Sequence, residues 1–417
     1  MALDSKVYDF IYQDLAQRLN NPESIYTLHS KIKKFDSVPS GVSVVDEVLC
    51  GGIPRGRITE IFGPEASGKT TLMLSFIAEA QRRGDMVYFI DAEHALDVDY
   101  AARIGVDVKS LLFCQPEYGE EALDTVSQIC DSIVAATEKF GKKINALVVI
   151  DSVPALIPKQ AFDVYADEKK EGLETTVALG LTATMLSRLL PVLVGKIARS
   201  NIALVFINQE RDAIGVMYGS PTTTPGGRAL KFFSSLRLKV SRCGFHEVAG
   251  QKIGIKTRML PIKSKLFPIF GKQAEFIIGP NGINMLASFA ETIVAKGIAK
   301  KSGSWLNVGD RKFQGIIQLE DELRNDKIFL KEMEQLIAQQ GGQSKPIELK
   351  PKVVVEGTVQ PSDAVAKSSG VSVTTTVGIA PTLSVVKPVG IPSLGAGVQQ
   401  IVSPISLPAA VVPIKTT

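Results

Sequence analysis

Apolar positions in the central part of the chain fall into short runs separated by longer segments with helical spacing. The runs are ITEIF at 58–62, MVYFI at 86–90, ALVVI at 146–150 and NIALVFI at 201–207. Buried runs of this length that alternate with helices are typical of a parallel sheet joined by crossover helices. The pattern therefore predicts an α/β domain with a mainly parallel central sheet.

The pattern differs at both ends of this domain. Residues 3–20 carry apolar side chains at helical spacing, which predicts an amphipathic helix that docks on this chain or on a neighbour: Val7, Phe10, Ile11, Leu15 and Leu19. Short helical patterns return around 286–300 and 321–340, enough for a small second domain. We expect this second domain to lack chemistry of its own.

The last 72 residues, 346–417, contain nine of the 22 prolines and no aromatic residue. Such a segment buries too little surface to offset the entropy of ordering it, so we expect a disordered tail. Its valine-rich runs leave a few edge strands as the alternative. Pattern and composition together divide the chain into four parts: 1–35 (N-terminal helix and strand), 36–285 (core), 286–345 (small α+β domain) and 346–417 (tail).

The segment between the strand ITEIF and the next helix carries the motif G-x-x-x-x-G-K-[ST]. Its residues are Gly63, Pro64, Glu65, Ala66, Ser67, Gly68, Lys69 and Thr70, followed by Thr71. In this motif the backbone N–H groups of a glycine loop converge on phosphate oxygens at a helix N-terminus. Lys69 adds a positive charge and Thr70 offers its hydroxyl to Mg²⁺. The motif predicts a site for a nucleoside triphosphate.

Carboxylates follow two of the predicted strands. Asp151 directly follows ALVVI and is placed to hold Mg²⁺, because the carboxyl ends of parallel strands share one sheet edge. Glu93 follows MVYFID and can reach the same edge, where it would orient or deprotonate water. Its position fits an exposed helix cap equally well.

Seven segments together resemble the bacterial RecA recombinases over about residues 25–340. They are GPEASGKTT (63–71), IDAEHALD (90–97), IDSVPALIPK (150–159), FINQ (206–209), IGVMYG (214–219), TTTPGGRALKF (222–232) and KQAEF (272–276). Their order and spacing agree with the family as well as their content. Many P-loop ATPases share the first and third segments, whereas the rest are specific to this branch.

The resemblance implies roles for individual residues. It makes Glu93 the group that activates the attacking water, and Gln209 the sensor of the γ-phosphate. Asp97 and Tyr100 would contact the adenine. Lys263 and Lys265 match a lysine pair that reaches the ATP of a neighbouring subunit, although K-x-K alone fits a solvated strand face.

The resemblance also implies two DNA-binding loops, at about 160–180 and 210–228. A connection as long as the second is usually functional or without fixed structure. Its candidate DNA contacts are Arg211, Gly226, Gly227 and Arg228, with Ser187 on the preceding helix.

The departures from the family pattern concentrate in the parts that face DNA. The first loop is about eight residues longer than usual, and the second carries the acids Glu210 and Asp212. Less positive charge near phosphates predicts a lower salt-dependent affinity for DNA, or one that depends more on Lys169, Lys170 and Arg188. The segment IIGPNG (277–282) lacks a tyrosine that the family places near the base, and the tail lacks the usual acids. These differences would suit a phage-encoded member.

Charge and cysteine content fit this reading. The formal net charge is +4 from 47 bases and 43 acids, so strong DNA binding requires local clusters or many subunits. The four cysteines are far apart, without a C-x-x-C pair and in apolar surroundings that predict burial, and the N-terminus does not resemble a signal peptide. We therefore expect a cytoplasmic protein that does not span a membrane.

The function implied is an ATP- and Mg²⁺-dependent recombinase that forms helical homo-oligomeric filaments on single-stranded DNA and exchanges strands with a duplex. Two alternatives remain at this point. One is a ring-forming helicase motor on the same core fold. The other is an ATP-binding filament that coats DNA without strand exchange.

Overall fold

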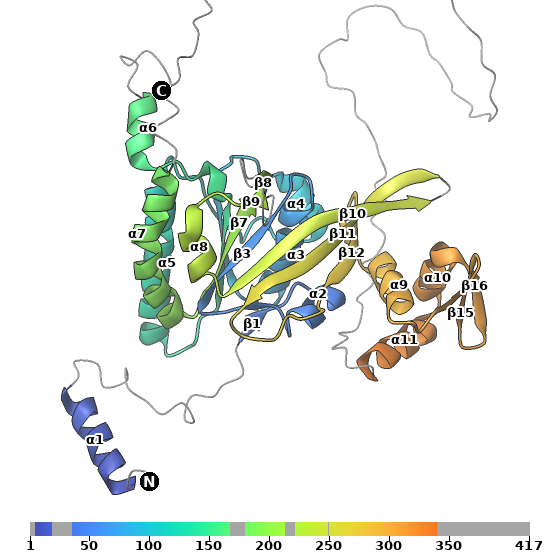
Figure 1. Cartoon of the computed structure of the whole chain (residues 1–417), viewed down its shortest axis with the longest axis horizontal. Helices are drawn as coiled ribbons and strands as arrows, with labels where there is room; N and C mark the ends of the chain where they lie inside the picture. The colour runs from blue at the N-terminus through green and yellow to red at the C-terminus, as the bar shows by residue number, and fades with distance from the viewer. Residues whose placement is uncertain (1–4, 19–35, 167–179, 213–221, 249, 340–417) are drawn as a thin grey trace, which may run out of the picture. The chain divides into compact units, whose positions relative to one another are not determined.

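The computed structural model describes residues 5–18, 36–166, 180–212, 222–248 and 250–339. The predicted tail at 346–417 and most of the first loop lie outside these ranges. In the described residues the largest element is a nine-stranded sheet with the order β13-β12-β11-β10-β3-β7-β6-β4-β5 (Figure 1). Neighbouring strands from β10 to β5 run parallel, and β11 to β13 add antiparallel strands at one side. The predicted α/β fold with a mainly parallel sheet is confirmed.

The sheet strands have these bounds: β3 Arg57–Gly63, β4 Met86–Asp91, β5 Leu112–Cys114, β6 Ala146–Asp151, β7 Ala203–Gln209, β10 Leu236–Val248, β11 Gln251–Ser264, β12 Ala274–Gly279 and β13 Gly282–Asn284. The helices around them are α2 Ser43–Val48, α3 Lys69–Arg82, α4 Val98–Ile104, α5 Gly119–Phe140, the 3₁₀ turn η3 Val153–Ala155, α6 Lys159–Ala166, α7 Leu181–Ser200 and α8 Gly227–Phe233. Short strands β1 Ser37–Val38 and β2 Ile53–Pro54 pair with each other, as do β8 Arg211–Asp212 and β9 Thr222–Thr223.

Alternation along the strands divides the core between the two faces of the sheet. Leu147 and Val149 of β6 join the cluster that contains α3, whereas Val148 and Ile150 join the cluster that contains α5 and α7. Successive side chains of a strand point to opposite faces, so a strand buried on both sides is apolar throughout. This double burial explains why the strands appear in the sequence as continuous apolar runs.

Helix α7 is the one described helix that is long and apolar enough to cross a bilayer. Its residues Leu186, Leu190 and Ile197 are fully buried in the core cluster with β6 and β7. The apolar face of α7 is therefore used in packing against the sheet.

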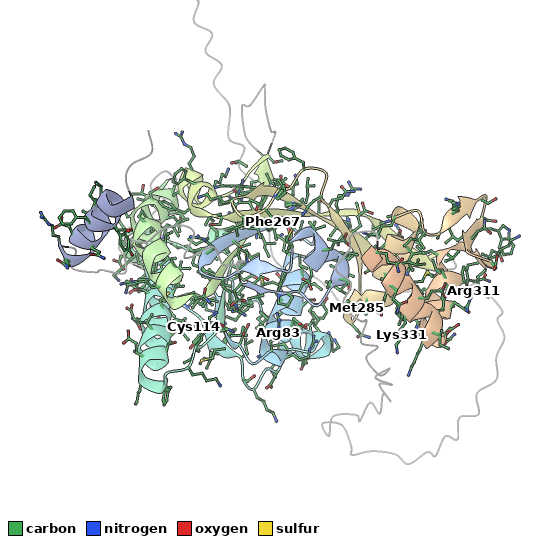
Figure 2. All side chains as sticks on the ribbon, turned by 90° about the horizontal axis from the view of Figure 1, so that it is seen from below. Arg83, Cys114, Phe267, Met285, Arg311 and Lys331 are labelled. Atoms are coloured by element: carbon green, nitrogen blue, oxygen red, sulfur yellow. The ribbon has the colours of Figure 1, made fainter. Side chains whose placement is uncertain are left out.

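The C-terminal part has a separate core. Helices α9 Met285–Ala295, α10 Gly315–Asn325 and α11 Lys327–Gln339 pack with a three-stranded antiparallel sheet of β14 Lys300–Ser302, β15 Trp305–Val308 and β16 Arg311–Gln314. Arg311 begins β16 and Lys331 lies in α11, as labelled in Figure 2. The predicted small α+β domain is present, with α9 beginning one residue before the predicted border.

The N-terminal helix α1 spans Ser5–Arg18, within the predicted range 3–20. Its apolar residues Val7, Phe10, Ile11 and Leu15 are exposed.

One sequence-based expectation is wrong. Of the four cysteines, Cys130 is buried, Cys50 and Cys114 are half-buried, and Cys243 is exposed on β10. Cys243 lies in the part of β10 that continues beyond β3, where strand pairing does not bury both faces.

Candidate nucleotide site and DNA-facing loops

Two glycines shape the loop between β3 and α3. A Cβ atom added to Gly63 would lie 1.8 Å from the carbonyl oxygen of Val240 on β10. Gly68 has a left-handed φ of 92°, and a Cβ there would lie 2.3 Å from Cδ1 of Ile278. A side chain at Gly63 would clash with backbone, whereas one at Gly68 would be strained and would have to displace the Ile278 side chain. The motif glycines are thus required by the packing of the loop as well as by phosphate access.

Lys69 and Ser67 point their polar atoms into this loop. The buried Lys69 ammonium donates to the carbonyl oxygens of Gly63 at 3.2 Å and of Pro64 at 2.6 Å. Burial lowers the pKa of Lys69, although the charges of Asp151 and Glu93 oppose that shift. The Ser67 hydroxyl is buried and has no hydrogen-bond partner within the described parts of the chain. A phosphate group would satisfy both side chains.

Three further loop residues are exposed, whereas Thr71 contacts a residue of α4. Pro64, Glu65 and Ala66 are exposed, and Ala66 adopts a left-handed φ of 53°. The hydroxyls of Thr71 and Tyr100 lie 3.1 Å apart, which places Tyr100 beside the start of α3. Asp97 caps α4 by accepting a hydrogen bond from the Tyr100 N–H at 2.8 Å. The structure thus adds a capping function to Asp97, beyond the adenine contact implied by resemblance.

Thr70 and Asp151 form the candidate metal site. The Thr70 hydroxyl donates to the Asp151 carboxylate across 3.1 Å. Burial, and after it the nearby negative charges of Glu93 and Asp91, raise the pKa of Asp151 to about 7, against the opposing effect of the Thr70 hydrogen bond. In the described residues no three His, Cys, Asp or Glu side chains gather into a metal site. The pair fits Mg²⁺, which takes one or two protein oxygens and completes its shell with phosphates and water.

Glu93 lies where the ends of three neighbouring strands meet. It follows β4, and its carboxylate accepts a hydrogen bond from the Ser152 hydroxyl, directly after β6. It also accepts one from the side-chain amide of Gln209, at the end of β7, across 3.3 Å. Sequence reasoning missed Ser152, although its position next to Asp151 was the available signal. The structure therefore brings together Glu93, Gln209 and Asp151, as the strand ends predict.

The lysine pair lies elsewhere. Lys263 donates to the carbonyl oxygens of Lys231 at 2.7 Å and Phe232 at 2.9 Å, and Lys265 donates to Phe232 at 3.2 Å. In the sheet Lys263 is paired with Arg237, which is level with Glu60, three residues before Gly63. Lys263 is therefore displaced from Gly63 by about 10 Å along the strands and, in addition, by two strand spacings across the sheet. Neither lysine therefore joins Lys69 within one subunit.

The described ends of the second loop are ordered. Arg211 is exposed on β8, which pairs with β9 before the chain enters α8 at Gly227. Gly226 has a left-handed φ of 88°, and a Cβ there would lie 2.9 Å from Cδ1 of Leu186 on α7. Exposed Ser187 follows Leu186 on α7, and exposed Arg228 lies in the first turn of α8. Four of the five candidate DNA contacts thus gather where α8 begins beside α7.

Comparison with known proteins places this arrangement in a family. The profile of the RecA N-terminal domain matches residues 13–284. Protein RecA of Aquifex aeolicus is 44% identical over 312 residues, covering 74% of this chain and 85% of the relative. Protein RecA of Heliobacterium modesticaldum is 41% identical over 336 residues, covering 78% and 92%.

The chain belongs to the RecA family.

RecA proteins are DNA-dependent ATPases that act in homologous recombination, and this is the function of the chain. The predicted family, fold class and activity are confirmed. The matches favour recombination over the ring-forming helicase. A further relative, Protein RecA of Rubrobacter xylanophilus, is 41% identical over 335 residues. The phage origin stays a prediction.

Proposed function

We propose that this RecA protein binds ATP with Mg²⁺ at the phosphate loop of one subunit and completes the site with lysines from the next subunit of a helical filament. The observation that carries the proposal is the meeting of Glu93, Ser152 and Gln209 at the sheet edge that also holds Lys69 and Asp151.

The nucleotide would be held by the loop 63–71, with the Lys69 ammonium moving from the Gly63 and Pro64 carbonyl oxygens to the phosphates. Thr70 and Asp151 would hold Mg²⁺, which when bound offsets negative charge on the phosphate oxygens. Asp97 and Tyr100 would face the adenine.

Hydrolysis would proceed by in-line attack of water on the γ-phosphorus while the bond to the β-phosphate oxygen breaks. The Glu93 carboxylate would orient that water and accept its proton. Ser152 and Gln209 hold this carboxylate in place. Lys69, together with Lys263 and Lys265 of the next subunit, would stabilise the negative charge that develops on the phosphate oxygens as ADP leaves.

Single-stranded DNA would bind along the two loops, with Arg211, Gly226, Gly227, Arg228 and Ser187 contacting its backbone. The exposed Arg228 in the first turn of α8 supports this proposal, because arginines beside helix N-terminal N–H groups attract phosphates. A homologous duplex would be the second DNA partner. This activity would take place in the cytoplasm of a bacterium, or of a cell infected by its phage.

Strand exchange with a labelled duplex, a homologous single strand, ATP and Mg²⁺ tests the proposal. We expect exchange with homologous DNA only, and none with either nucleotide or metal omitted. Electron microscopy with a slowly hydrolysed ATP analogue should show helical filaments on single-stranded DNA. Closed rings, or filaments without exchange, would contradict it.

A further inference from the structure

The second loop is tied at its base to the phosphate loop through Glu210, the residue after Gln209. The backbone N–H of Glu210 donates to the carbonyl oxygen of Gly63 at 3.0 Å. That oxygen also accepts a hydrogen bond from the Lys69 ammonium at 3.2 Å. The first residue of the second loop and the phosphate-binding lysine therefore share one acceptor.

The Glu210 side chain connects the two ends of the same loop. One carboxylate oxygen, Oε1, accepts hydrogen bonds from the Thr222 hydroxyl at 2.5 Å and from the Lys239 ammonium at 2.7 Å. The Glu210 side chain is only 8% exposed and that of Lys239 is 34% exposed. A partly buried, charge-assisted contact of this kind is stronger than an exposed ion pair.

Lys239 is fixed in position by the sheet. It lies on β10 opposite Phe62 of β3, one residue before the phosphate loop begins. The next residue, Val240, places its carbonyl oxygen against Gly63 so closely that no side chain fits there. Lys239 is therefore anchored beside the phosphate loop, whereas its partners Glu210 and Thr222 belong to the second loop.

Only two short strands pair the described ends of the second loop. Strands β8 and β9 pair through two residues each, Arg211 with Thr223 and Asp212 with Thr222. Two-stranded ribbons of this length are marginal in water. The contacts of Glu210 add a second link between the loop ends.

We propose that Glu210 and Lys239 form a positioning pair that holds the base of the second loop against the phosphate loop and so couples DNA binding to ATP turnover. Neither residue contacts the reacting atoms. The pair keeps Glu210 and Thr222, at the two ends of the loop, in fixed positions, so that less conformational entropy of these residues is lost when DNA binds. This inference rests on the proposed role of the second loop in binding DNA.

The test measures ATP turnover against the concentration of single-stranded DNA for the full chain and its variants Glu210→Gln, Lys239→Gln and the double variant. For either single variant we expect half-maximal stimulation to need roughly tenfold more DNA, the cost of losing about one charge-assisted hydrogen bond. DNA-free turnover should stay within about twofold of the unsubstituted protein. The double variant should resemble either single variant, because the two residues act as one unit.

A matched control is Lys296→Gln, because Lys296 lies outside both loops. Its ammonium lies 2.8 Å from the Glu47 carboxylate, and its side chain is 23% exposed. It should leave the DNA requirement unchanged. The inference is overturned if the single variants keep the normal DNA requirement, if turnover with and without DNA falls in the same proportion, or if the two single effects add. Absence of DNA stimulation in the unsubstituted protein would instead contradict the proposed function, so the two failures are distinguishable.

Discussion

The side-chain amide of Gln209 donates a hydrogen bond to the Glu93 carboxylate across 3.3 Å, and this contact joins the ends of two strands that are separated by β6 in the sheet. Gln209 ends β7, and the second loop begins at the next residue. A change in the position of Glu93 on nucleotide binding would therefore move or break its hydrogen bond to Gln209, the residue directly before that loop.

Replacing Glu93 with Gln should slow ATP hydrolysis by roughly 10²- to 10⁴-fold, because the amide cannot accept the proton of the attacking water. ATP binding, measured by equilibrium dialysis, should persist since Lys69 and the loop are intact. Ser152→Ala should cause a smaller loss of about tenfold, as expected for a residue that orients the carboxylate. Ser304→Ala, at an exposed turn, is the control. Equal losses in the Glu93 and Ser152 variants would argue against separate catalytic and positioning roles.

The location of Lys263 and Lys265 predicts complementation between subunits. Lys69→Ala alone, and Lys263→Ala with Lys265→Ala, should each lose nearly all DNA-stimulated turnover. An equal mixture of the two proteins should recover about a quarter of normal turnover, because one random head-to-tail interface in four combines an intact loop with intact lysines. Lys69→Ala should also lose nucleotide-dependent DNA binding.

The matched control for this experiment mixes the Lys69→Ala protein with a Lys143→Ala protein, whose substituted residue pairs with Asp36 at 2.9 Å. Here the Lys143→Ala protein should be active alone. No recovery in the lysine-pair mixture, with filaments visible by electron microscopy, would show that the pair does not act across the interface.

The raised pKa of Asp151 predicts how stability depends on pH. A carboxyl whose pKa is higher in the folded than in the unfolded state loses stability as pH rises from about 3.8 to about 7, because only the unfolded chain ionises readily in that range. Asp151→Asn should remove this loss and raise the free energy of unfolding of the nucleotide-free protein at pH 8, by roughly 1 to 4 kcal/mol.

Urea unfolding at pH 4 and pH 8 measures the effect. The variant and the unsubstituted protein should differ little at pH 4 and most at pH 8. Added ATP and Mg²⁺ should stabilise the unsubstituted protein but stabilise the variant much less. A variant less stable than the unsubstituted protein at pH 8 would contradict an electrostatic cost at Asp151.

The sheet could be predicted because its strands are buried on both faces, so that runs such as ALVVI stand out from the helices around them. The strand-end rule then located Asp151 and Glu93 without any contact information. Ser152 could not be found in this way, because a serine after a strand is common and only the fold shows that its hydroxyl reaches Glu93.

Two other features depended on contacts between distant segments. The Glu210 side chain appeared in the sequence as an unfavourable acid near DNA, whereas the structure pairs it with Lys239, which is 29 residues away. The apolar sequence around Cys243 predicted burial, but Cys243 is exposed because it lies where β10 extends beyond the end of β3. The local sequence pattern predicts whether a strand is buried, but not how far the neighbouring strands extend beside it.

The packing around Gly68 allows a test that separates steric clash from backbone strain. Gly68→Ala should lose stability because of its φ of 92° and because the new Cβ would lie 2.3 Å from Cδ1 of Ile278. Gly84→Ala has a similar φ of 81° but meets no atom within 4 Å, so it should lose only the strain of about 1 to 2 kcal/mol. Adding Ile278→Val to Gly68→Ala removes Cδ1 and should recover part of the difference in thermal unfolding. If the second substitution instead lowers stability further, Ile278 is not the group that excludes a side chain from this loop.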